Sequence, residues 1–368
     1  MLSSRERLLR SIHHQSIDRV PVSTYELVGW NENAWENKEP TYGKLMNAIR
    51  ENTDCIYMFD AYVGQDPDES EETENWEEGS STYSKKILHS KNGDLTALYR
   101  TDKDIHTTWT LKHLLEDIND IDKYLSLPYK TPIIDMDLLF KEQAKLGDKG
   151  VMMISVYDPI GLAADLFEMG TFLVHAITES EKIKYLMDSI HERQMCGLKE
   201  ILKYDVRNII FRICGPEYAT PPYLSPEYYY EFVTRYLNKI CRTIRDAGGI
   251  PRIHSHGKIG KVIDQFAGTD AQGLDPIEPL PDGDIDLAVV KKIYGQKFCL
   301  FGNIELKELE MADRKRIDFL VKKAMEAAKE GGGFVLMPTA SPINVPLSAV
   351  TEQNYLQMIE SALEYGHY

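Results

Sequence analysis

The chain has 368 residues and a formal net charge of −16, with 43% hydrophobic and 27% charged residues. This composition is typical of a globular protein, and the length fits either two domains or one α/β barrel. The negative charge disfavours binding to nucleic acid or to an anionic membrane surface. No apolar run reaches the roughly 18–20 residues that a membrane-spanning helix needs.

The N-terminal residues and the cysteines predict a cytoplasmic protein. The opening stretch MLSSRERLLRSIHH is charged and lacks the apolar core of a signal peptide. The cysteines are odd in number and show no CxxC spacing, so we expect reduced thiols rather than disulfides. They are Cys55, Cys196, Cys214, Cys241 and Cys299.

The first elements alternate between helix and strand. Ser3 or Ser4 can cap a helix, and Ser3 with Glu6 fits a capping box. Residues 19–25 then predict a short strand. A helix over 41–52 and a strand over 53–62 follow, and this strand ends in an acid.

The amino-acid composition and the predicted secondary structure change between residues 65 and 105. Residues 66–78 carry eight acids and no base, which predicts a solvated loop, with a specific partner site as the less favoured alternative. Residues 81–90 and 95–101 flank an Asn-Gly turn and predict a β-hairpin. We therefore expect an acidic loop and a hairpin inserted at about 65–105, after which a helix over 108–128 returns to the main fold.

From Gly150 the chain alternates regularly between strand and helix, which is typical of parallel βαβ units. Eight strands lie outside the hairpin, so we predict an α/β fold: one (β/α)8 TIM barrel spanning 1–368, with an N-terminal helical extension. An open doubly wound sheet is the alternative, although no G-x-G-x-x-G follows the first strand. The six later strands are predicted at 151–156, 208–214, 250–256, 271–277, 297–304 and 334–339.

Polar side chains follow almost every predicted strand, where βα loops carry the catalytic groups of such a barrel. This clustering favours an enzyme over a passive scaffold. The strand-end residues are Tyr25, Glu26, Asp60, Tyr157, Asp158, Cys214, Glu217, His254, His256, Asp275, Glu278, Asn303, Glu305, Thr339 and Ser341.

His254 and His256 are the most informative pair. Residues i and i+2 of a strand face the same side, so both imidazoles point into the barrel mouth if Ser255 faces the helices. Two imidazoles on one face are half of a catalytic zinc site, which uses three protein ligands and one open position. Asp275 and Glu217, on the two flanking strands, are the candidates for the third ligand. The alternative is a histidine general base beside a hydrogen-bonded neighbour.

The remaining candidates divide into chemical and binding roles. Asp60, Glu217 and Tyr157 are predicted to be catalytic, although Asp60 has an ion pair and Glu217 a helix cap as structural alternatives. The predicted substrate-binding residues are Tyr25, Glu26, Tyr218 and Asn303.

Several stretches, in the same order along the whole chain, resemble the uroporphyrinogen decarboxylase superfamily. They are RERLLRSIHHQSIDRVPV, TDCIYMFD, LSPEYYYEF, PRIHSHGKI, GLDPIEP, FCLFGNIE and GGGFVLMPTASPI. That superfamily also includes corrinoid-dependent methyltransferases and, more distantly, cobalamin-independent methionine synthase. The resemblance implies a (β/α)8 barrel.

The branch is indicated by how this chain departs from its relatives. Asp60 matches the acid that holds the tetrapyrrole of the decarboxylase, but the arginine-rich stretch after the first strand is PVSTYELVGWNENAWEN, without arginine. The zinc methyltransferases have His-x-Cys at His254 and a second cysteine near Ala340 or Ser341; here the first cysteine is replaced by His256 and the second is absent. Asp275 matches an acid that binds zinc in methionine synthase-like barrels.

Imidazole and carboxylate ligands form a harder site than thiolates, suited to an ether or alcohol oxygen. We therefore expect a zinc-dependent methyltransferase that moves a methyl group from a small substrate, such as a methoxylated aromatic, to a corrinoid. No D-x-H-x-x-G signature is present, so the corrinoid is expected on a partner protein, which the acidic loop at 66–78 could contact. The alternatives are uroporphyrinogen decarboxylation and a non-catalytic barrel that binds a small molecule.

Overall fold

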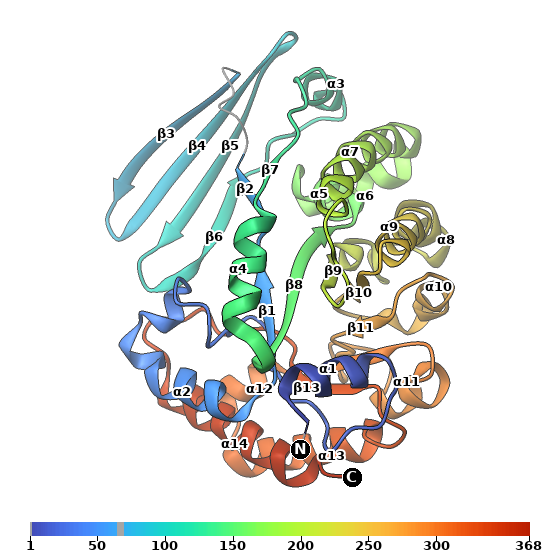
Figure 1. The fold of residues 1–368 in the computed structure, drawn as a ribbon. Helices are drawn as coiled ribbons and strands as arrows, with labels where there is room; N and C mark the ends of the chain where they lie inside the picture. The colour runs from blue at the N-terminus through green and yellow to red at the C-terminus, as the bar shows by residue number, and fades with distance from the viewer. Residues whose placement is uncertain (1, 65–69) are drawn as a thin grey trace.

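A curled parallel sheet forms the centre of the computed structural model, which describes residues 2–64 and 70–368. In this part of the chain the sheet has seven strands in the order β1-β8-β9-β10-β11-β12-β13, with helices on its outside (Figure 1). The strands are β1 (Cys55–Phe59), β8 (Gly150–Tyr157), β9 (Ile210–Cys214), β10 (Ile250–His254), β11 (Gly273–Asp275), β12 (Cys299–Ile304) and β13 (Phe334–Pro338).

The eighth position of the predicted barrel is filled by an irregular segment. The expected strand over 19–25 forms only a single parallel bridge, between Val22 and Leu336 of β13. Leu336 N–H donates to the Pro21 carbonyl at 2.9 Å, and Asp54 N–H donates to the Val22 carbonyl at 2.7 Å. Pro21 has no N–H to give, which limits the ladder here. The structure therefore shows a seven-stranded half-barrel with a bridging segment, and not the closed eight-stranded barrel that we expected.

The helices cover the outer face of the sheet and are capped by local side chains. Ser3 and Glu6 form the capping box expected at the first helix, and Asp313 and Ser348 cap two of the last helices. Around the sheet lie α1 (Ser4–Ile12), α2 (Gly43–Asn52), α4 (Met136–Leu146), α5 (Pro159–Asp165), α6 (Met169–Thr178), α7 (Ser180–Ile201), α8 (Pro226–Tyr229), α9 (Arg235–Asp246), α10 (Ile263–Ala267), α11 (Leu287–Tyr294), α12 (Leu306–Met311), α13 (Arg314–Ala328) and α14 (Ala349–Tyr365).

Short elements complete the chain. A π-helical turn, Tyr230–Thr234, joins α8 to α9, and the pair β2 (Tyr62–Gly64) and β7 (Ile133–Ile134) is antiparallel. Single 3-10 turns lie at Trp35–Asn37, Pro40–Tyr42, Gly147–Lys149, Pro216–Ala219 and Ile259–Lys261.

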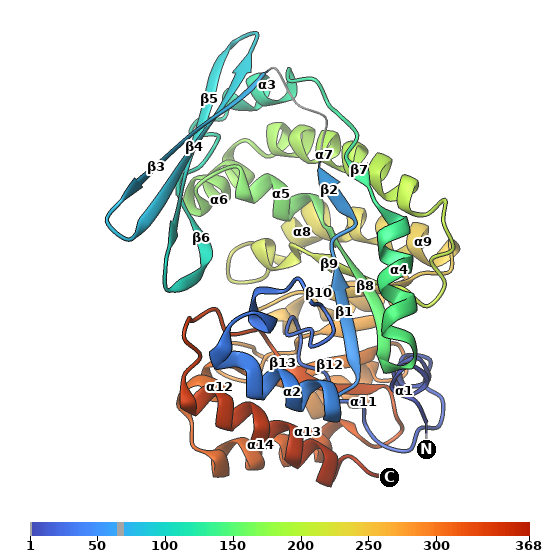
Figure 2. The same ribbon diagram turned by 60° about the vertical axis from the view of Figure 1, so that its left-hand side comes forward.

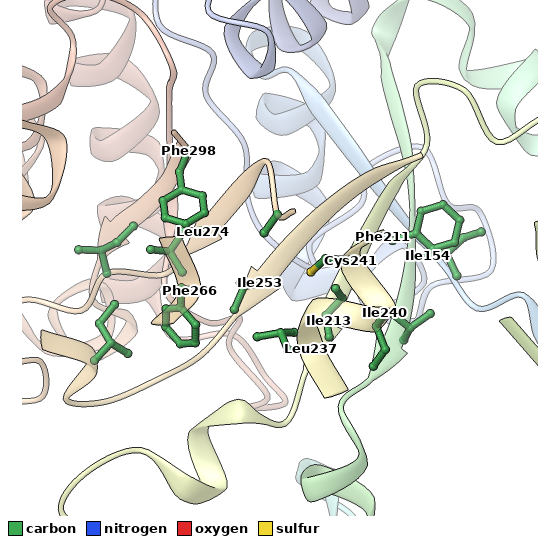
Figure 3. Packing of buried hydrophobic residues seen from close by; sticks show 14 of the residues in the cluster. Ile154, Phe211, Ile213, Leu237, Ile240, Cys241, Ile253, Phe266, Leu274 and Phe298 are labelled. Atoms are coloured by element: carbon green, nitrogen blue, oxygen red, sulfur yellow. The ribbon is translucent and has the colours of Figure 1, made fainter. Parts of the chain in front are cut away.

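Alternation along each strand divides the core into two layers. Ile250 of β10 belongs to a cluster inside the curled sheet, together with Val151 and Val335. Ile253 belongs to the larger cluster between the sheet and the helices, which Figure 3 shows with Leu237 and Phe266. Because side chains alternate with a period of two, the strand that buries Ile253 outward must turn Arg252 and His254 inward. The inner layer therefore leads directly to the carboxyl ends of the strands.

The inserted segment is larger than expected. It forms a four-stranded antiparallel sheet, β3 (Glu71–Glu78), β4 (Ser81–Ser90), β5 (Gly93–Asp102) and β6 (Ile105–Lys112), set against α3 (Asp120–Leu125). Figures 1 and 2 show this sheet standing apart from the barrel, on the side toward which β1 and β8 run. The hairpin of residues 81–90 and 95–101 is its centre.

Two expectations at the insertion are corrected. Of the acidic loop expected over 66–78, residues 66–69 lie outside the described residues, but Glu71–Glu78 is an edge strand. Ion pairs of Glu71 with Lys86 and Glu74 with Lys85, and a Trp76–Tyr83 stack, hold it to β4. The helix expected over 108–128 begins instead as β6, and only Asp120–Leu125 is helical.

In the described part of the chain, no single helix is long and apolar enough to cross a membrane. The helices α5 and α6 reach the required length and composition only as a pair, across a bend of 117°.

A buried carboxylate fixes the N-terminal segment against the sheet. Asp54 is fully buried and accepts hydrogen bonds from Arg7 Nη1 at 2.7 Å, from Arg19 Nη1 at 2.7 Å and from Val22 N–H at 2.9 Å. These contacts place α1 and the bridging segment at the end of the barrel opposite the inserted sheet.

Replacing Asp54 with alanine leaves two largely buried guanidinium groups without their shared carboxylate. We expect Asp54→Ala to lower the free energy of unfolding by about 3–5 kcal/mol, measured by urea denaturation. The control is Glu181→Ala, which removes an 88%-exposed partner of Lys184 and should cost less than about 1 kcal/mol. Equal losses in the two variants would show that Asp54 does not hold the segment.

Candidate active site

The predicted site residues meet at the carboxyl ends of neighbouring strands. In the strand register His254 lies opposite Asp275, and Tyr157 lies opposite Cys214. Ser255 is buried on the helix side, with its hydroxyl 3.4 Å from that of Thr220. The condition for both imidazoles facing the inside of the barrel is therefore met.

His254 is held from behind by a buried carboxylate. Its Nδ1 lies 2.7 Å from Asp275 Oδ2, and Arg252 donates to both oxygens of Asp275 at 2.6 Å. Burial raises the pKa of Asp275, but the charges of Arg252 and His254 outweigh it and hold the pKa below its ordinary value. An ionised carboxylate only accepts hydrogen bonds, so Nδ1 of His254 carries the proton and Nε2 the lone pair.

The second nitrogen of His254 faces a tyrosine. Tyr25 Oη lies 3.3 Å from Nε2 and also contacts the guanidinium of Arg212. Because the guanidinium can only donate, the Tyr25 hydroxyl accepts from Arg212 and donates to Nε2. Burial lowers the pKa of His254 to about 3 despite the opposing charge of Asp275, so the ring is neutral near pH 7.

His256 repeats this arrangement closer to solvent. Its Nδ1 lies 2.7 Å from Glu278 Oε1, and Glu278 Oε2 accepts from Gly257 N–H at 2.6 Å. Burial lowers the pKa of His256, but the hydrogen bond and charge of Glu278 prevail and raise it above the ordinary value. The two imidazole centroids are 4.7 Å apart and their planes are nearly perpendicular, at 85°.

His254 and His256 are suited to binding a metal ion, but a third protein ligand is not in place beside them. In many metal sites a carboxylate holds the other nitrogen of each histidine ligand, as Asp275 and Glu278 do here. Among the described residues, however, no three His, Cys, Asp or Glu side chains are grouped to hold an ion. Asp275, expected as the third ligand, is buried with both oxygens engaged by Arg252 and His254, so its position is behind the histidine rather than beside it.

Glu217 remains the other candidate. It lies in the 3-10 turn after β9, and its Oε2 accepts from Gly215 N–H at 3.0 Å. Burial raises its pKa, while the nearby charge of His256 partly offsets this. A carboxyl group with a raised pKa beside an imidazole is suited to holding or donating a proton.

Asp60 and Tyr157 lie at the ends of β1 and β8, the two strands before β9 in the sheet order. Asp60 is exposed, and its Oδ1 accepts from Tyr62 N–H at 2.9 Å. Tyr157 is 51% exposed. Both face solvent at the mouth and are not in hydrogen-bonding contact with the histidines.

The predicted substrate-binding residues lie in three different places. Tyr25 and Glu26 are joined through Arg212, whose Nη1 donates to Glu26 Oε1 at 3.2 Å. Tyr218 lines a cavity of about 450 Å³ that also contacts His256 and Glu217. Asn303 is turned aside, and its Nδ2 donates to the Ile277 carbonyl at 3.2 Å.

Sequence reasoning missed the two arginines inside the barrel, and it gave no role to one of the strand-end acids, Glu305. Arg212 and Arg252 lie opposite one another in the β9–β10 register, two residues before Cys214 and His254, so the alternation of strands could have placed them. Glu305 follows β12, and burial together with the charge of Glu278 raises its pKa to about 7. Its signal in the sequence was its position directly after a strand.

The two histidines should be distinguishable in metal-free protein by NMR of their ring nitrogens. We expect His254 to remain the neutral Nδ1–H tautomer from pH 5 to 8, because its pKa lies far below this range. We expect His256 to keep its proton to a higher pH than a free imidazole. His254→Gln assigns the signals, and a His254 ring that titrates near pH 6.5 would contradict the proposed hydrogen-bond pattern.

Comparison with known proteins identifies the family. Residues 109–356 match the family described as uroporphyrinogen decarboxylase (URO-D), whereas no curated protein matches the chain. Among solved structures, a methyltransferase from Methanosarcina mazei aligns with a TM-score of 0.62 and 16% identity over 99% of both chains. A B12-independent methionine synthase from Shewanella sp. W3-18-1 aligns with a TM-score of 0.42 and 12% identity over 76% of this chain and 73% of that chain, which is too remote to bear on function. Because the family match spans more than half of the sequence, the chain belongs to the uroporphyrinogen decarboxylase family.

Proposed function

We propose that this protein is a metal-dependent methyltransferase that takes a methyl group from an oxygen of a small substrate, with zinc as the metal. The observation that carries the proposal is the pair of imidazoles at the barrel mouth, each held at Nδ1 by its own carboxylate at 2.7 Å. Family membership and the fold shared with a methyltransferase support an enzyme of this kind.

His254 and His256 would hold the ion through Nε2, and Asp275 and Glu278 would orient the two rings. A bound zinc ion would supply Lewis acidity toward an ether or alcohol oxygen. At His254 the ion would replace the hydroxyl of Tyr25, which now lies 3.3 Å from Nε2. Water or the substrate oxygen would complete the ligand set, because Glu217 accepts from Gly215 N–H and has a raised pKa, which suits it to proton transfer instead.

The other side chains would bind substrate and manage its proton. When a methyl group leaves an ether oxygen, the remaining oxyanion needs a proton, and Glu217 with its raised pKa is placed to supply it. Tyr218 and Tyr223 line the cavity beside His256 and would contact a flat apolar substrate. Asp60 and Tyr157 would meet the polar part of the substrate at the mouth.

The methyl acceptor is proposed to be a reduced corrinoid carried by a separate protein, because this chain lacks a D-x-H-x-x-G signature. The edge strand Glu71–Glu78, with every residue exposed, is available to such a partner.

Decarboxylation of uroporphyrinogen is supported less well by the site. That substrate carries many carboxylates, yet Arg252 is already paired with Asp275 and Arg212 with Glu26. A polyanion would also meet Glu217, Glu278 and Glu305 at the same rim, on a chain of charge −16.

Metal content tests the proposal directly. Protein purified without chelators should contain about one zinc per chain, as a single site requires, and His254→Ala and His256→Ala should each lose it. Tyr25→Phe should retain zinc, because it removes only the hydroxyl that competes for Nε2. His89→Ala, on the inserted sheet, is the matched control.

Methyl-transfer activity should be lost in the variants that lose zinc. With a reduced corrinoid protein and a panel of methoxylated aromatics, the wild type should produce the absorbance of methylated corrinoid, and both histidine variants should not. Full activity in metal-free protein would contradict the zinc proposal, and formation of coproporphyrinogen from uroporphyrinogen would establish the decarboxylase instead.

A further inference from the structure

A second cavity, of about 800 Å³, lies between the barrel and the inserted sheet. Its walls come from β2, β3, β4, α3, the 127–132 loop, the end of β8, α5, α7 and α9. The acid of β3, Glu71, is paired with Lys86 of β4. Figure 2 shows α7 and β8 on the barrel side of this region, with β4 and β5 of the inserted sheet opposite. The volume falls in the range of small-molecule sites. We call it the side cleft.

The guanidinium of Arg193 lies in the side cleft and forms no ion pair with an acid among the described residues. Arg193 of α7 is half-buried, and its Nη2 donates to the Leu125 carbonyl over a long distance of 3.5 Å. Across the described residues, no Asp or Glu oxygen lies within 4 Å of its guanidinium. The chain has sixteen more acids than bases, so an arginine that pairs with none of the described acids is unusual. Such a guanidinium can bind an anionic group of a ligand through charge-assisted hydrogen bonds.

Aromatic rings surround this guanidinium. Its central carbon lies 5.8 Å from the centroid of Tyr124 and 5.4 Å from that of Tyr129. Tyr62 and Tyr157 line the same cleft, together with the apolar Leu88. Tyrosine faces of this kind favour flat ligands and hold an arginine in place through cation–π contact.

A neighbouring amide connects the cleft to the barrel mouth. Gln194 donates from Nε2 to the Tyr157 carbonyl at 3.0 Å, while its Oε1 is buried without a partner. Tyr157 therefore belongs both to the wall of the side cleft and to the strand end at the mouth. The free Oε1 would accept a hydrogen bond from a hydroxyl or amine on a ligand.

We propose that the side cleft binds a flat aromatic anion, with the anionic group on Arg193 and the ring among the tyrosines. This binding does not depend on a metal or on the proposed methyl transfer, because none of the groups involved contacts the histidines. Tyr62 and Leu88 precede the family match at residues 109–356, so part of the cleft is built from sequence outside that match.

The test measures binding by isothermal titration calorimetry with 2-naphthoate on the purified full chain. Two comparison compounds test separately whether the anionic group and the flat ring are needed. 2-Naphthylmethanol has the ring without the charge, and cyclohexanecarboxylate has the charge without the flat ring. We expect 2-naphthoate to bind at least tenfold more tightly than either, since a charge-assisted hydrogen bond corresponds to about tenfold or more in affinity.

Variants locate the binding. Arg193→Gln should weaken 2-naphthoate binding by tenfold or more. The matched control is Arg235→Gln, because Arg235 also lies over a tyrosine ring, at 5.1 Å, but has Asp188 and Glu231 as partners. Gly197→Leu provides a second variant, since a side chain there would extend toward Tyr62 and Pro132 and fill the cleft.

His256→Ala separates this proposal from the proposed function: it should lose zinc and keep 2-naphthoate binding. Unchanged binding in both Arg193→Gln and Gly197→Leu would overturn the side-cleft proposal, as would equal affinity for all three compounds. Loss of binding in His256→Ala would assign the ligand to the barrel mouth and would also overturn it.

Discussion

The buried chain Arg252–Asp275–His254 is the constraint on which the rest of the site depends. Arg252 and Asp275 have side chains that are 1% and 0% exposed, so their charges are stable there only as a pair. Their pairing fixes Asp275 as an ionised acceptor, which in turn fixes the tautomer of His254. The chemistry of Nε2 at the barrel mouth is therefore set by an ion pair one layer below it.

The fold provides this arrangement through strand alternation. Inward positions of β9 and β10 carry Arg212 and Arg252 in one layer and Cys214 and His254 in the next. The acids come from the strand that follows, β11, and from the loop after it. A polar interior is tolerated here because Arg252 pairs with Asp275 of the neighbouring strand and Arg212 pairs with Glu26, next to the bridging segment. The two cavities share no lining residue: one is lined by His256 and the other by Tyr157.

Much of this could be predicted from the sequence, and the failures have physical reasons. The family, the alternating α/β order and the shared face of His254 and His256 follow from periodicity and motifs. The prediction of a strand over 19–25 was wrong because Pro21 has no N–H to donate and the segment forms a single bridge, between Val22 and Leu336, instead of a ladder. The prediction of a loop for the acidic run was wrong because Glu71 and Glu74 pair with Lys86 and Lys85 of the neighbouring strand, which allows Glu71–Glu78 to form a strand. Asp275 was expected beside the histidines because Arg252, which holds it behind them, was not counted as an inward residue.

We propose that His254 and His256 bind one ion through their Nε2 atoms. Crystals of the protein as purified, measured on both sides of the zinc absorption edge, test it most directly. One anomalous peak should lie within bonding distance, about 2.0–2.1 Å, of both Nε2 atoms, with Asp275 and Glu278 still on the Nδ1 atoms. No peak at the mouth in zinc-replete protein, or a Tyr25 hydroxyl still bonded to His254 beside an ion bound elsewhere, would contradict it.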